Sequence, residues 1–82
     1  MNRIAAAVAK IQQLYNENQN LQNYIVHLNT EYEIITDQYM NGNITYPIGP
    51  QQRKLKSAAN KAARQMEKNS ELIRKLKVRY SL

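Results

Sequence analysis

Basic residues with a regular spacing are the groups in this chain best suited to bind something charged. Four lysines recur at every seventh position near the C-terminal end: Lys54, Lys61, Lys68 and Lys75. Three arginines accompany this lysine row: Arg53, Arg64 and Arg74. On a helix the lysines would lie on one side, about 10.5 Å apart, so that they could follow a nucleic-acid backbone, an anionic membrane or an acidic protein. No aromatic residue interleaves with them as a stacking platform, and the solvated outer face of a coiled coil would have the same spacing.

Residues suited to catalysis or metal binding are few. His27 is the only histidine and the chain has no cysteine, which excludes a disulfide and leaves little basis for a zinc site. Glu33 and Asp37 can share one side of a helix, but two helices offer no sheltered cleft to separate the pKa values of paired carboxylates. The sequence therefore predicts a non-enzymatic protein without a cofactor or a metal ion.

An apolar heptad repeat runs through the first half of the chain. One set of positions holds Ile4, Ile11, Asn18, Ile25, Tyr32 and Tyr39, and the other holds Ala7, Leu14, Leu21, Leu28 and Ile35. These are the a and d positions of a coiled coil, which together form its buried seam. The repeat predicts a helix over residues 2–40.

A loop and a second helix are predicted for the remainder. Both glycines and both prolines fall between Gly42 and Pro50, which indicates a loop over 41–49. A basic helix over 50–80 then has a seam of its own: Leu55, Ala59, Ala62, Met66, Asn69, Ile73, Leu76 and Tyr80. From Gln51 onward the chain has ten of its 12 Lys and Arg residues but two of its six acidic ones.

The predicted fold is all-α, a single domain over 1–82 that folds back as an antiparallel, coiled-coil-like helical hairpin. Tyr39 beside Leu55 would place tyrosines opposite alanines, with facing residue numbers that sum to about 94. In that register residues 1–11 overhang the second helix. Their side chains are too apolar to leave in water, so we expect them to bind a second copy or another protein.

The polar residue Asn18 interrupts the first seam. Six residues carry a resemblance to a parallel leucine zipper over about three heptads: Ile11, Leu14, Asn18, Leu21, Ile25 and Leu28. In such a zipper a single asparagine at an a position fixes two strands and their register. The alternative is a polar residue inside a hairpin or four-helix bundle, bonded to Asn69 of some chain. We favour the bundle, because the second helix also needs cover, and predict this interface: Ile4, Val8, Ile11, Leu14, Asn18 and Leu21.

The length of 82 residues limits the size of any core, and a small scaffold without disulfides usually needs oligomerisation. We expect dimerisation into a four-helix bundle. The predicted function is protein–protein interaction, as a small adaptor, assembly or regulatory accessory protein of the kind that bacteria and phages encode, with itself or another helical protein as partner. Sequence-nonspecific nucleic-acid binding through the basic helix is the alternative. The longest apolar run, Ile4 to Ala9, is too short for a membrane span or a signal peptide, so the expected location is cytoplasmic or otherwise intracellular.

Overall fold

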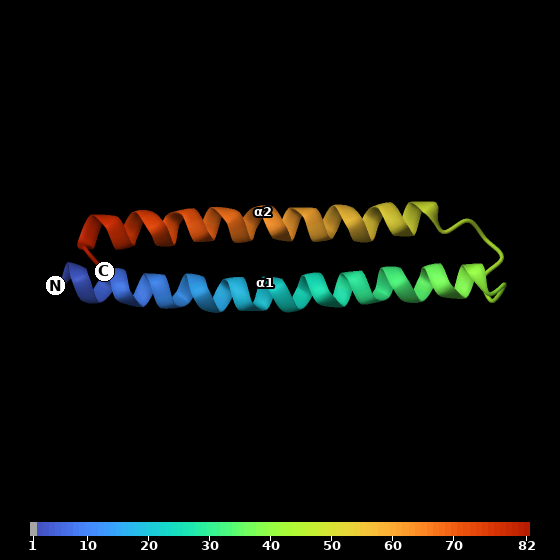
Figure 1. Cartoon of the computed structure of the whole chain (residues 1–82), viewed down its shortest axis with the longest axis horizontal. Helices are drawn as coiled ribbons and strands as arrows, with labels where there is room; N and C mark the ends of the chain where they lie inside the picture. Colours follow the sequence, from blue (N-terminus) through green and yellow to red (C-terminus); the bar gives the residue numbers. More distant parts are fainter. Residues whose placement is uncertain (1) are drawn as a thin grey trace.

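Two long helices lie side by side in opposite directions in a computed structural model that describes residues 2–82 (Figure 1). Helix α1 spans Arg3–Met40 and helix α2 spans Gly49–Tyr80. The hairpin is 61 Å long and 16 × 14 Å in cross-section. The all-α antiparallel hairpin that the sequence predicts is confirmed. The predicted helix 2–40 begins one residue before the start of α1, and the predicted helix 50–80 begins one residue after the start of α2.

Both ends of α1 are closed by residues suited to the task. The side chain of Asn2 accepts hydrogen bonds from the backbone N–H groups of Ile4 and Ala5, at 3.0 and 3.3 Å. At the other end Gly42 has φ 78°, a left-handed conformation that glycine adopts without strain. The N–H of Asn43 then bonds to the carbonyl of Gln38 at 2.9 Å, which satisfies a carbonyl of the last helical turn.

The loop between Met40 and Gly49 reverses the chain and packs against the end of the hairpin. Ile48 is buried and accepts a backbone hydrogen bond from Gln52 at 2.9 Å, which starts α2. The side-chain amide of Gln52 donates to the hydroxyl of Thr36 at 2.9 Å, across to α1. Ile44 is half-buried, whereas Tyr46 is exposed. The loop therefore closes this end of the hairpin mainly with one isoleucine.

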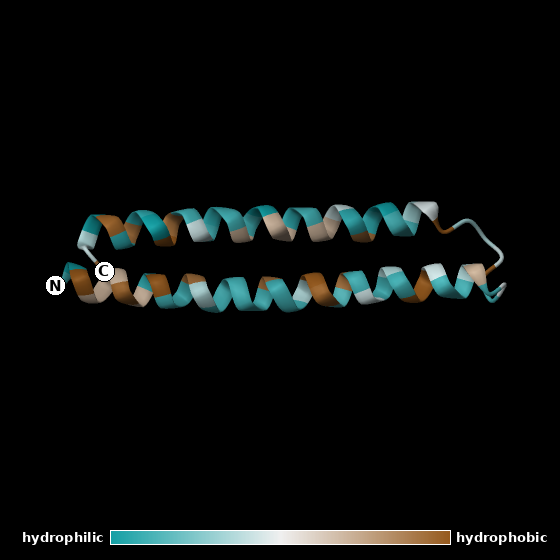
Figure 2. Ribbon diagram, viewed as in Figure 1, coloured by the Kyte–Doolittle hydropathy of each residue, from teal (hydrophilic) through white to brown (hydrophobic). Residues whose placement is uncertain are grey.

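The seams predicted from the heptads are the surfaces that pack. The buried residues of the helices are all seam positions: Ala7, Ile11, Leu14 and Leu28 in α1, and Ala62, Asn69 and Ile73 in α2. Ile4 and Tyr39, at the two ends of the α1 seam, are exposed instead. Figure 2 shows a hydrophilic stretch near the middle of α1, with apolar residues toward both ends. The apolar packing is thus interrupted where the asparagines lie.

Two seam asparagines fill this interruption by bonding to each other. Asn69 is only 4% exposed, and its amide nitrogen donates to the Oδ1 of Asn18 at 3.0 Å. The Oδ1 of Asn69 accepts from the side chain of Gln65, also at 3.0 Å, and Asn18 donates to the hydroxyl of Ser70 at 3.3 Å. We call the pair the asparagine layer. Its hydrogen bonds satisfy groups that would otherwise be costly to bury.

The asparagine layer corrects the predicted register. Asn18 faces Asn69, so the numbers of two residues that face each other across the helices add up to about 87. The predicted sum is about 94, so the observed alignment differs from the predicted one by seven residues, or one heptad. The predicted overhang of residues 1–11 is wrong, since Ala7 and Ile11 are buried and the two termini lie at the same end of the hairpin (Figure 1). Both registers place apolar seams face to face, but only this one brings the two polar seam residues together.

Replacing one member of the asparagine layer should destabilise the hairpin. In Asn18→Ala the buried amide of Asn69 loses its acceptor, which we expect to lower the free energy of unfolding by about 1–3 kcal/mol. Asn20→Ala, at an exposed position of the same helix, should change it by less than about 0.5 kcal/mol. Urea denaturation followed by circular dichroism measures both. Equal stability of the two variants would contradict the role given to the layer.

Candidate functional site

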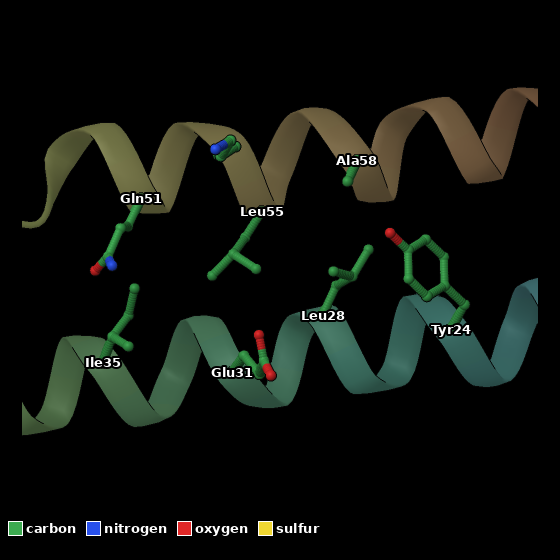
Figure 3. A pocket seen from close by; sticks show the side chains of 8 residues that line it. Tyr24, Leu28, Glu31, Ile35, Gln51, Leu55 and Ala58 are labelled. Carbon is green, nitrogen blue, oxygen red and sulfur yellow. The ribbon is translucent and has the colours of Figure 1, made fainter.

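A groove runs between the two helices on one side of the hairpin. It has a volume of about 510 Å³ and is lined by Tyr24, Leu28, Glu31, Ile35, Gln51, Lys54, Leu55 and Ala58. Leu28 and Ile35 point from α1 toward α2, and Leu55 points back toward α1 (Figure 3). The groove is therefore an apolar trough with one acidic and one basic residue among its lining.

The small size of the α2 side chains accounts for this groove. Ala58 occupies a heptad position beside the seam, where a longer side chain would reach over Leu28 and Leu55. Tyr24 stands at the same heptad position on α1 and is 48% exposed, so its ring is left without full cover. We call this side of the hairpin the groove face.

On the opposite face lysines of α2 contact tyrosines of α1, beside a smaller depression of about 330 Å³. The ammonium of Lys77 donates to the hydroxyl of Tyr15 at 2.8 Å and lies 5.3 Å from the centre of its ring. Lys56 lies 5.7 Å from the ring centre of Tyr32. These contacts combine a cation with an aromatic face and fold long side chains over the apolar surface. Tyr15 is nevertheless 45% exposed, close to the 48% of Tyr24, so the two faces differ in the lysine contacts of their rings and not in the exposure of those rings.

The lysine row lies along α2 at the outer margin of the groove face. Lys54 lines the groove, and Lys61, Lys68 and Lys75 follow at heptad intervals, all exposed. Within residues 2–82 the contacts between acidic and basic side chains join His27 to Glu31 at 3.1 Å and Arg74 to Glu71 at 2.6 Å, so the row has no acidic partner there. Arg53, Lys56, Lys61 and Arg64 also border one shallow depression of about 410 Å³. Five of the ten basic residues of α2 thus lie in its loop-side half, which contains no acidic residue.

Arg74 differs from the other predicted anion-binding residues because it is already paired. Its guanidinium holds the pKa of Glu71 below the usual value for a glutamate, first through their hydrogen bonds and then through its charge. The same contact raises the pKa of Arg74. Both side chains are exposed, so the pair is a local surface feature that leaves Arg74 less available to an external anion.

The predicted interface residues fall into two groups. Ile11 and Leu14 form a buried cluster with Ile73, against which Leu76 packs, so α2 of the same chain already covers them. Asn18 belongs to the asparagine layer, and Leu21 is half-buried. Ile4 and Val8 remain 52% and 49% exposed, and for them an interface at this end of the hairpin stays a prediction.

Comparisons with known proteins add no family and no relative: no family model matches the chain, and searches of curated proteins and of solved structures find no match. Across residues 2–82 no three His, Cys, Asp or Glu side chains come together as a metal site. Neither helix of this described part is long and apolar enough to cross a membrane. The geometry of the hairpin is therefore the basis for a functional proposal.

The groove itself was missed by sequence reasoning. Tyr24, Glu31 and Ala58 are not among the predicted site residues, because the heptad pattern singles out the seams and the lysine row and assigns nothing to the positions beside the seams. A signal was present: on the correct register, the positions beside the seam of α1 carry Tyr24 and Glu31, and the matching position of α2 carries an alanine. Without the register, these residues could not be placed opposite one another.

The Glu71–Arg74 pair should make a small, pH-dependent contribution to stability. A lowered pKa in the folded state means that the contribution is present above the usual glutamate pKa and is lost as the pH falls through the lowered value. We therefore expect Glu71→Gln to lower the melting temperature slightly at neutral pH and to match the wild-type chain in strong acid. Glu67→Gln, at an exposed position one turn earlier, is the control. A Glu71→Gln deficit that persists in strong acid would contradict the pairing.

Proposed function

We propose that the chain is a non-enzymatic protein–protein interaction module, an adaptor, assembly or regulatory accessory protein that packs its hairpin against another helical surface. Its first partner is a second copy of itself, with which it forms a four-helix bundle. The proposal is supported by the exposed area of the hairpin, since two helices packed only against each other leave much of their surface in contact with water.

Exposed area is the observation that carries the proposal. The chain exposes 6366 Å². A compact monomer of its mass, 9.6 kDa, would expose about 5,100 Å². The excess of about 1,300 Å² is in the range that each subunit of a stable dimer buries. In addition, no side chain of residues 2–82 is less than 2% exposed, so the hairpin has packed layers but no fully enclosed core.

Several large apolar side chains contribute to this excess on the outer surfaces. Val26 and Ile34 of α1 are 53% and 49% exposed, and Leu72 of α2 is 40% exposed. Single exposed apolar residues are common on monomers, but a narrow two-helix rod presents all of them to water with no third layer above. Packing a second hairpin over one face would supply that layer.

Self-association should appear as a stability that depends on concentration. If the folded dimer is the stable form, raising the concentration from about 5 µM to about 500 µM should raise the melting temperature by at least about 5 °C. Circular dichroism at both concentrations measures this shift, and sedimentation equilibrium gives the mass. A helical monomer with one melting temperature over the whole range would contradict the proposal.

A second candidate function is binding of nucleic acid without sequence preference through α2. It is favoured by the lysine row, whose four members are exposed and have no acidic partner within residues 2–82. The net charge of +6 would draw the chain toward polyanions. All four lysines stand on one continuous helix, so the distances between their backbone positions are fixed.

Nucleic-acid binding through the row should be steeply dependent on salt. We expect the affinity for duplex DNA to fall by at least about tenfold between about 50 and 200 mM salt. In a variant with glutamine at all four positions of the row, the slope of log binding constant against log salt concentration should be smaller in magnitude by about four. Arg3→Gln/Lys10→Gln, which removes basic charge from α1, is the control. Fluorescence anisotropy measures binding, and no binding at about 20 mM salt would rule out this candidate.

A further inference from the structure

We propose that the groove face receives a second copy of the chain, with α1 of each copy lying antiparallel across α2 of the other. The two-fold axis of this dimer runs parallel to the helices. The inference rests on the proposed self-association and adds the face, the orientation and the contacting residues. Three independent features of the described residues support it: shape, charge and the difference between the two faces.

The shape of the groove face is complementary to itself. Tyr24 projects from α1 at its exposed margin, whereas Ala58 leaves α2 hollow at the matching heptad position. In a two-fold dimer every contact occurs twice with the roles exchanged. Because facing residue numbers sum to about 87, Tyr24 is level with a point on α2 between Ala58 and Gln65. Each tyrosine would therefore lie beside the hollow at Ala58 of the other copy, a large side chain next to a small one. The groove of about 510 Å³ has room for such side chains.

The charges on the two margins of the groove face are complementary in the same arrangement. Glu31 lines the groove from α1 and Lys54 lines it from α2. Glu31 contacts His27 of its own helix at 3.1 Å, but no ion pair joins it to Lys54 within the chain. The register of the asparagine layer places them at nearly the same height along the hairpin. With α1 of one copy across α2 of the other, Glu31 faces Lys54 twice in the dimer.

A second pair repeats this match at the same spacing. Glu17 precedes Glu31 by two heptads, and Lys68 follows Lys54 by two heptads, so both belong to the same margins of the groove face. The opposite arrangement, with α1 across α1, would bring the acidic margins together and cost affinity. Toward the termini, Lys10 of one copy would face Lys75 of the other, and these like charges repel. The closest contact between the copies is therefore expected in the loop half of the hairpin, where the apolar groove lies.

The opposite face is less suited to receive a second copy. Lys77 already contacts Tyr15 there and Lys56 contacts Tyr32, although Tyr15 stays 45% exposed. Docking on that face would require these lysines to move and would strip water from their charges. No residue lies over the ring of Tyr24 in a comparable contact within residues 2–82.

Charge reversal tests the proposed pairs. By sedimentation equilibrium, we expect Glu31→Lys to weaken the dimer dissociation constant at least about tenfold, because both symmetry-related pairs become repulsive. Adding Lys54→Glu to the same chain should restore the constant to within about threefold of the wild type. Glu33→Lys, the same change on the opposite face, is the matched control and should alter it by less than about twofold.

The outcomes separate this inference from the proposal on which it rests. A wild-type dimer that Glu31→Lys weakens no more than Glu33→Lys does would overturn the groove face as the interface and leave self-association intact. A wild-type chain that remains monomeric overturns both. Circular dichroism of each variant shows whether its helices are retained, and the charge-swapped double variant keeps the test meaningful if Glu31→Lys folds poorly.

Disulfide trapping tests the orientation directly, since the natural chain contains no cysteine. Gln38→Cys and Gln51→Cys place thiols beside the seam on the groove face of α1 and α2, near the loop. Mixing the two purified variants under mild oxidation should give mainly the mixed disulfide. The matched pair on the opposite face, Asn29→Cys with Ala63→Cys, should give little. Trapping by the opposite-face pair alone, or of Gln38→Cys with itself, would overturn the arrangement.

Discussion

The structure depends on one polar contact, the hydrogen-bonded pair of Asn18 and Asn69 in the middle of the helix interface, to which Gln52 and Thr36 add a second hydrogen bond near the loop. Two heptad seams can slide past each other by seven residues and still bury apolar faces, because the repeat is unchanged by such a shift. With facing numbers that sum to 94, Asn18 would meet Leu76 and Asn69 would meet Ile25. Each buried amide would then lack its partner, at about 1–3 kcal/mol per group, which is a large share of a small domain's stability.

Several features follow once that register is fixed. The start of α1 and the end of α2 lie at the same end of the hairpin (Figure 1), so that Ile11 and Leu14 pack against α2 and do not extend beyond it. Ile48 reaches the end of the hairpin, and the side chain of Gln52 meets Thr36. The same register brings Glu31 level with Lys54 across the groove. One polar layer therefore sets both the length of the internal core and the charge pattern on the outer face.

The sequence was sufficient to predict the elements but not their alignment. Heptads located the seams, Gly42 located the end of α1, and the prolines located the turn, since each depends on local preferences. The predicted register rests on matching tyrosines with alanines, and side-chain size is a weak criterion when the second helix has alanines at several neighbouring positions. The presence of one asparagine in each seam was the stronger signal. One of the two interpretations of Asn18 names Asn69 of some chain as its partner, but a partner in an unspecified chain does not align the two helices.

The two proposed roles of the lysine row are compatible because the row exceeds what a second copy can neutralise. In the proposed dimer Glu17 and Glu31 of one chain face two lysines of the other, so Lys61 and Lys75 keep no acidic partner across the interface. Each chain has a net charge of +6, and a dimer would concentrate twice that charge on a rod of similar length. Long-range repulsion between the copies and attraction to a polyanion are both screened over about 8–10 Å at moderate salt. Salt therefore weakens the binding of nucleic acid, while it reduces the repulsion between the two copies of the dimer. A bound polyanion would itself offset the repulsion that opposes dimerisation.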